Sequence, residues 1–292
     1  MKFKSKVFVI ALMMLLLLCV SCVSASENET FLSNDGGEVL TLNEDEILLD
    51  SQENEVMSRT EEDMLSAQSF DKLQEFIDNT EEGGTLNLVY DFNSNSGDTT
   101  TIPISKSITI EGNGHYITGS GEHGILKIDD DKLNHAISVT LKNIKFSGGV
   151  ANGGAISVDS DNYKVDLTII DCEFTENKGH IYGGAILYDP GTEDSSLTIS
   201  GSSFINNQAT YKSFFTTAVG GAIAARNGVV KVEGCSFAGN SATRSGGAIY
   251  SLCEVTIDNC YFYLNHAPDD GGAIYSKGTL KWGENPSEFK EK

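Results

Sequence analysis

The sequence predicts an all-β chain that folds as a right-handed parallel β-helix of roughly eight coils, with a short N-terminal capping α-helix. Three observations lead to this fold class: a two-part motif that recurs five times, an alternating strand pattern ahead of each copy, and glycine or asparagine between the strands. We expect the β-helix domain at residues 67–284, the repeats themselves at 139–276, and a tail at 285–292.

The repeat has two halves in a fixed order. One half, Gly-Gly-Ala-Ile, begins at residues 153, 183, 220, 246 and 271. The other half precedes it and is a phenylalanine, followed three residues later by asparagine in four of the five copies: Phe146, Phe174/Asn177, Phe204/Asn207, Phe237/Asn240 and Phe262/Asn265. The spacings between phenylalanines, 28, 30, 33 and 25 residues, fit a solenoid and are too short for four-stranded propeller blades.

Parallel coils stack about 4.8 Å apart, so equivalent residues of successive coils should form ladders. We expect one ladder of phenylalanines and one of the isoleucines of Gly-Gly-Ala-Ile. A kink at Asn259 would also point Cys260 inward, which predicts a third ladder of Ile144, Cys172, Ser202, Cys235 and Cys260. The repeat asparagine suits a turn, where it tolerates left-handed φ and can bond its neighbours along the stack. The paired glycines allow a sharp bend between coil faces.

A short helix is predicted at residues 69–80. Phe70, Leu73, Phe76 and Ile77 fall on one stripe, and Ser69 suits the N-cap position. A terminal element of a stacked repeat must cover the open end, so we expect this helix to cap the first coil.

The N-terminal residues have the pattern of a secretory signal peptide at 1–25. Three lysines precede an apolar run at 7–20, and a Val-Ser-Ala cleavage site follows at 23–25. The run is short for a membrane-spanning helix. The sequence therefore predicts a secreted, extracellular or cell-surface protein, with no membrane insertion after signal removal.

Residues 26–66 are predicted to form an acidic disordered spacer, because they are rich in carboxylates and lack sustained apolar periodicity. They contain one glycosylation acceptor pattern, at Asn28, whose use is left open. The net charge of −22 becomes −25 once the three leader lysines are lost. Such a chain should repel nucleic acid and polyanionic polysaccharides.

No cofactor, metal or catalytic residue is assigned from the sequence. Four cysteines follow the leader, none with Cys-x-x-Cys spacing, so a zinc site is not expected. Cys235 and Cys260 should lie on adjacent coils, but side chains that point the same way suit a disulfide poorly, and buried thiols are expected. Aspartates at 129–131 and 269–270 are the candidates for calcium, although such clusters are more often solvated turns.

The motif Gly-Gly-Ala-Ile with Phe-x-x-Asn resembles the repeat of the chlamydial polymorphic outer membrane proteins. The wider layout resembles the adhesin-like proteins of methanogenic archaea, through the helix, Ile-Thr-Ile-x-Gly-Asn-Gly at 108–114 and Val-Thr-Leu-Lys-Asn-Ile-x-Phe at 139–146. The resemblance covers about residues 69–276 and implies a β-helical domain on a cell surface, with adhesion as its role. The first copy departs from the pattern, with Gly149 in place of asparagine. How such a chain is held at a surface is left open.

The third repeat carries the candidate ligand-binding loop. It has 16 residues from Phe204 to Gly220, where three other copies have 9, and the longer stretch holds Tyr211, Phe214 and Phe215. Insertions in solenoids become loops on one face, often the binding face. The alternative is that these aromatic side chains fold against the solenoid's own flank.

We expect an adhesin-like protein that attaches to a glycan or protein on a host or neighbouring cell and performs no catalysis. Two alternatives are a polysaccharide-degrading lyase or hydrolase of the pectate-lyase-like superfold and a purely structural surface spacer. A lyase on an acidic polysaccharide would need cationic residues near its catalytic base, but the repeats contain only two arginines, Arg226 and Arg244, which we expect on exposed turns. No motif selects the pair of carboxylates that a glycosidase needs. A bare coil edge near Trp282 would also favour end-to-end self-association.

Overall fold

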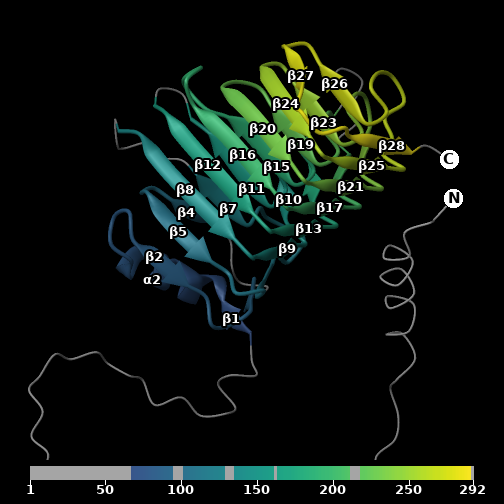
Figure 1. Cartoon of the computed structure of the whole chain (residues 1–292). Coiled ribbons are helices and arrows are strands. Elements are labelled where there is room, and N and C mark those ends of the chain that lie inside the picture. The colour runs from purple at the N-terminus through teal and green to yellow at the C-terminus, as the bar shows by residue number, and fades with distance from the viewer. Residues whose placement is uncertain (1–66, 95–100, 129–134, 161–162, 211–217, 291–292) are drawn as a thin grey trace, which may run out of the picture. The chain divides into compact units, whose positions relative to one another are not determined.

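The computed structural model describes residues 67–94, 101–128, 135–160, 163–210 and 218–290. Their strands wind into a right-handed parallel β-helix, which confirms the predicted fold class (Figure 1). The predicted signal peptide and acidic spacer lie outside the described residues.

Each full coil contributes a strand to the first sheet, then to the second and finally to the fourth; a short third sheet lies before the fourth in the middle coils. The first sheet contains β2 (Thr85–Asn87), β5 (Ile108–Glu111), β8 (Ile137–Lys142), β12 (Val165–Ile170), β16 (Ser196–Ser200), β20 (Val229–Glu233), β24 (Glu254–Asp258) and β27 (Leu280–Trp282). The second contains β1 (Gln68–Ser69), β3 (Phe92–Asn93), β6 (Tyr116–Thr118), β9 (Lys145–Ser147), β13 (Glu173–Thr175), β17 (Ser203–Ile205), β21 (Ser236–Ala238), β25 (Tyr261–Tyr263) and β28 (Glu288–Lys290).

The third sheet contains β10 (Val150–Ala151), β14 (Lys178–Gly179), β18 (Gln208–Ala209) and β22 (Ser241–Ala242). The fourth contains β4 (Ile102–Ile104), β7 (Leu126–Ile128), β11 (Ile156–Asp159), β15 (Ile186–Asp189), β19 (Ile223–Ala225), β23 (Ile249–Ser251) and β26 (Ile274–Ser276). All of the pairings between these strands are parallel, so the outward face of each sheet carries one residue per coil at each position.

The helix α2 (Phe70–Asn79) covers the N-terminal end of the solenoid (Figure 1). Ser69 is its N-cap, and the Ser69 hydroxyl accepts a hydrogen bond of 3.2 Å from the backbone N–H of Lys72. Phe70, Leu73 and Ile77 are buried in the same core as the coils. The predicted capping helix is thus confirmed.

The phenylalanines form the predicted ladder inside the second sheet. Phe146, Phe174, Phe204, Phe237 and Phe262 are buried, and successive rings stack with centroids 4.8–5.0 Å apart. The ladder continues to Phe289, whose ring lies 4.8 Å from that of Phe262. Phe289 belongs to β28, in the segment for which we expected a tail at 285–292. The ring stacking and the pairing of β28 with β25 extend the solenoid into that segment.

The third ladder is also as expected. Ile144, Cys172, Ser202, Cys235 and Cys260 are all buried, and the chain kinks before them in a left-handed conformation, with φ of 48° at Asn259. The kink lets residues on both sides of the corner point inward, because it breaks the alternation of the strand.

The repeat asparagines bond along the stack, but they do not take the left-handed conformation that we expected. That conformation lies one residue earlier, with φ of 56° at Glu176 and 55° at Asn206. The buried side chain of Asn177 instead donates to Asn207 Oδ1 at 3.0 Å and to the Phe146 carbonyl oxygen at 3.1 Å. Asn177 therefore links its own coil to the coils before and after it.

The two glycines of Gly-Gly-Ala-Ile have different roles. The first has a positive φ, 60° at Gly183, which a side chain would disfavour. A Cβ on the second would collide with a carbonyl oxygen of the next coil, as for Gly184 against Gly221. The pair therefore permits both the bend and the close approach of neighbouring coils.

Candidate functional site

One flank of the solenoid carries two ladders of residues, and two separate hollows lie along them. One ladder directly precedes the glycine pairs and consists of Asn152, Tyr182, Val219, Ser245 and Asp270, the last four joined by isolated parallel bridges. The other lies on the outer face of the fourth sheet and consists of Lys127, Ser157, Leu187, Ala224, Tyr250 and Tyr275, which pair in this order from coil to coil. We call the surface between these two ladders the flank groove.

The flank groove is hollowed in two places. Near its N-terminal end, a hollow of about 200 Å³ lies beside Thr101, Lys127, Asn152 and Ser157. A smaller hollow, of about 40 Å³, lies beside Arg244, Tyr250, Asp270, Tyr275 and Lys277. In Figure 1, the strands β7, β11, β15, β19 and β23 of the fourth sheet follow one another along the solenoid, so both hollows lie on the same side.

Between the hollows, the groove is closed. Leu187 and Ala224 occupy outward positions of the fourth sheet, yet both are buried. The Arg226 guanidinium lies over the Tyr182 ring, 4.7 Å from its centroid, and pairs with the Asp189 carboxylate. Arg226 follows β19 directly, so its side chain crosses the groove.

The smaller hollow combines aromatic rings with charged groups of both signs. The rings of Tyr250 and Tyr275 stack with centroids 5.3 Å apart. Burial raises the pKa of Tyr250, and the neighbouring tyrosines raise it further, so its hydroxyl keeps its proton and can donate at neutral pH. Arg244 Nε lies 3.9 Å from an Asp269 carboxylate oxygen. The Lys277 ammonium pairs with no carboxylate among the described residues.

The predicted binding residues Tyr211, Phe214 and Phe215 lie outside the described residues, so their role stays a prediction. The described ends of this segment are held at the third sheet. The N–H of Thr210 donates to the Gly179 carbonyl oxygen at 3.0 Å, and that of Ala218 to the Thr243 hydroxyl at 2.9 Å. Thr210 and Ala218, the described residues on either side of this segment, are therefore bonded to the solenoid, and Ala218 directly precedes Val219 of the flank groove.

Three of the four described cysteines have a raised pKa, whereas the pKa of Cys260 is lowered by its hydrogen bond with Cys235. Cys172, Cys235, Cys253 and Cys260 are unpaired, which confirms the expectation of free thiols. Burial raises the pKa of Cys172 to about 12, and the pKa of Cys235 is raised by a hydrogen bond with Cys260 and by burial. The Cys172 thiol donates to the Ile170 carbonyl oxygen at 3.4 Å. Thiols with a raised pKa are inert because the reactive thiolate is scarcely populated.

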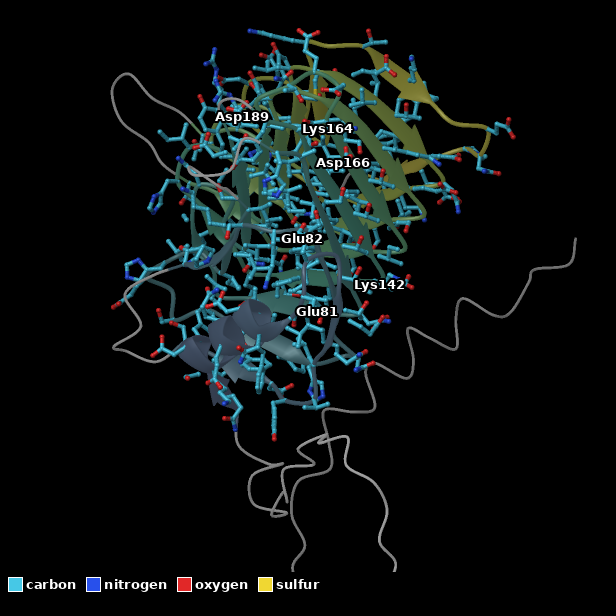
Figure 2. All side chains as sticks on the ribbon, turned by 90° about the vertical axis from the view of Figure 1, so that its left-hand side faces the viewer. Glu81, Glu82, Lys142, Lys164, Asp166 and Asp189 are labelled. Carbon is cyan, nitrogen blue, oxygen red and sulfur yellow. The ribbon has the colours of Figure 1, made fainter. Side chains whose placement is uncertain are left out.

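The carboxylates of the first-sheet side are spread over several coils. Figure 2 labels Glu81 and Glu82, which precede the first coil's β2, and Asp166 of β12. Asp166 pairs with the Lys164 ammonium at 3.1 Å and accepts a bond from the Ser196 hydroxyl at 2.7 Å. The Asp166 carboxylate is therefore held by a cation and a hydroxyl. A glycosidase site instead requires two carboxylates that face each other across the scissile bond.

The described residues contain no group of three or more His, Cys, Asp or Glu side chains placed to hold a metal ion. The aspartates at 129–131 lie outside the described residues, and Asp269 faces Arg244. Nor do the described residues include a helix long and apolar enough to cross a membrane.

Comparison with family models identifies the Chlamydia polymorphic membrane protein (Chlamydia_PMP) repeat at residues 234–252 and 259–277. Each matched segment starts at a left-handed residue, Gly234 or Asn259, and ends just past the tyrosine of the flank groove. No curated protein and no solved structure matches the chain. The resemblance to the chlamydial repeat is confirmed, while that to archaeal adhesin-like proteins stays a prediction.

Outward ladder positions were missed by sequence reasoning. Lys127, Ser157 and Tyr250 share no residue type, so no motif marks them as equivalent. The residues before each glycine pair could have been found, because Gly-Gly fixes their position in every copy.

Proposed function

We propose that the chain is a cell-surface, adhesin-like β-helix protein that attaches to a glycan or protein on another cell and performs no catalysis. The observation that carries this proposal is that the repeat contains two kinds of position, those that hold the coils together and those that face outward. Phenylalanine, asparagine and the glycine pair recur because they hold the coils together, while the outward positions of the flank groove change from coil to coil.

Two further observations support the proposal. The repeats match a family model described as a polymorphic membrane protein repeat, which favours a surface location. A rigid stack presents its outward side chains with little loss of conformational entropy on binding, which favours recognition.

A lyase or hydrolase remains the second candidate, since the same superfold serves enzymes. The pKa values of the Cys172, Cys235 and Cys253 thiols are raised, and the Asp166 carboxylate is paired with the Lys164 ammonium. These observations favour attachment over chemistry. A purely structural spacer would have the same solenoid fold but would need no groove on its surface.

A cell-attachment assay distinguishes an adhesin from a structural spacer. Beads coated with the purified chain should adhere to a panel of cells, and the triple variant Tyr211→Ala, Phe214→Ala, Phe215→Ala should lose most of that adhesion. Val229→Ala, at an exposed position on the first sheet, is the matched control and should adhere like the parent chain. Beads that adhere no better than uncoated ones would contradict the proposal.

A further inference from the structure

We propose that the flank groove binds a linear, uncharged glycan whose chain follows the solenoid axis. This inference rests on the proposed function, since it names the ligand class and the surface that an adhesin of this shape would use.

The backbone of the flank is closed to an extended peptide. The strands β7, β11, β15, β19 and β23 each pair with a strand on both sides. Their N–H and C=O groups therefore have partners in the coils before and after. A peptide that binds by strand addition needs a free sheet edge, which these strands do not offer. Recognition here must come from side chains.

The side chains of the larger hollow suit a ligand rich in hydroxyl groups. The hydroxyls of Thr101 and Ser157 and the amide of Asn152 can each donate and accept hydrogen bonds. No carboxylate lines this hollow. The Asn152 Oδ1 already accepts a bond of 2.9 Å from the Ile181 N–H, which fixes its amide so that the NH₂ group is left to donate to a ligand.

The smaller hollow adds the aromatic surface that sugar rings favour. Tyr250 and Tyr275 each present a ring and a hydroxyl, and aromatic residues with a polar end suit ligands that are apolar on one face and wet on the other. Arg244 and Lys277 donate, and Asp270 accepts. At about 40 Å³, this hollow would admit a hydroxymethyl or acetamido group instead of a whole ring.

The overall charge of the chain favours an uncharged ligand. The chain as a whole has a net charge of −22, which opposes a polyanion. Along the groove, Arg226 is paired with Asp189, and Arg244 lies near Asp269, so carboxylates offset these two arginines. Lys127 and Lys277 also line the hollows, so it is the net charge of the whole chain that disfavours a polyanionic glycan.

The positions of the hollows favour a chain ligand over a single sugar. Four coil steps separate β7, beside the larger hollow, from β23, beside the smaller one. At the usual strand spacing, this is about 19 Å. A ligand that uses both hollows must span that distance and pass over Arg226 and Tyr182 between them.

Direct titration of the purified chain tests the proposal. The probes are hexasaccharides and disaccharides of β-linked glucose, mannose and N-acetylglucosamine, with a heparin hexasaccharide as the polyanion. We expect at least one uncharged hexasaccharide to bind, and to bind more tightly than its disaccharide. Ser157→Trp, at an outward, half-buried position in the larger hollow, should weaken that binding about tenfold or more. Tyr275→Ala should weaken it from the other hollow.

Thr168→Trp is the matched control, because Thr168 is an outward, half-buried residue of the first sheet, on a different face. It should leave the affinity unchanged, and equal thermal midpoints for all variants would show that they fold alike. The inference is overturned if no uncharged probe binds, if heparin binds more tightly than every uncharged probe, or if Ser157→Trp and Thr168→Trp act alike. Cell attachment by a chain that fails these titrations would leave the adhesin proposal standing and remove only the groove as its site.

Discussion

At the scale of single residues, the phenylalanine ladder holds the second sheet to the core. Phe237 is fully buried and lies between Phe204 and Phe262, with ring centroids 4.8 and 4.9 Å away. Its removal would leave a cavity that two stacked rings cannot fill by moving, because each is held by its own coil.

Phe237→Ala should therefore lower the free energy of unfolding by about 3–5 kcal/mol. Urea unfolding followed by circular dichroism measures this change, with Ser236→Ala on the outward side of the same strand as the control. An unfolding midpoint equal to that of the parent chain would show that Phe237 does not pack in the core.

The asparagine ladder contributes to the stability of the fold because its side chains accept hydrogen bonds from buried N–H groups. Asn207 Oδ1 accepts from both the backbone N–H and the side-chain NH₂ of Asn177, each at 3.0 Å. Asn207→Ala would leave the buried backbone N–H of Asn177 without this partner and its NH₂ group with only the Phe146 carbonyl oxygen. An unsatisfied buried donor typically costs about 1–3 kcal/mol. The same unfolding assay should show this loss, whereas the half-buried neighbour Gln208→Ala should change little.

The buried thiols give a separate test of the third ladder. Because the pKa of Cys172 is raised to about 12, almost no thiolate is present below pH 9. A thiol reagent added to the folded chain at pH 8 should modify Cys172 only as fast as the chain unfolds. Rapid modification in the absence of denaturant would place this side chain outside the core.

At the scale of elements, α2 shields the first coil. Leu73 is fully buried between this helix and the solenoid. Leu73→Asp would bury a charge without a partner and should detach the helix, exposing the first coil's apolar edge. We expect a lower unfolding midpoint and concentration-dependent association in sedimentation velocity. Asn79→Asp, at an exposed position of the same helix, is the control and should remain monomeric if the parent chain is.

The elements also show what the sequence could and could not reveal. The helix was predicted at 69–80, and the structure places it at Phe70–Asn79 with Ser69 and Thr80 as its caps. The left-handed turn residue was assigned to the repeat asparagine, because the true positions, Glu176, Asn206 and Leu264, share no residue type. β28 was missed because Phe289 stands without the second half of the repeat.

The candidate site was predictable only in part. The length of the third repeat pointed to Tyr211–Phe215 as a loop, but the flank groove depends on which strand residues face outward and on how successive coils align. Those alignments follow from the register in which the coils stack. Because the repeats differ in length, the sequence alone does not show which residues of neighbouring coils are paired.

At the scale of the whole molecule, the last described coil exposes large apolar side chains. Trp282 is 55% exposed and Phe289 48% exposed. End-to-end self-association through this coil stays a prediction. It would place two flank grooves on one assembly, and paired weak sites bind a surface more tightly than either alone.

The most direct test of the central claim, attachment without catalysis, is the release of new reducing ends from polysaccharides. The purified chain is incubated with a panel of neutral and acidic polysaccharides, with calcium present, and binding to the same polysaccharides is measured in parallel. We predict binding to at least one neutral polysaccharide and no release above that of a heat-unfolded control. Sustained release that scales with the amount of protein would contradict it and would point to a carboxylate pair as a catalytic site.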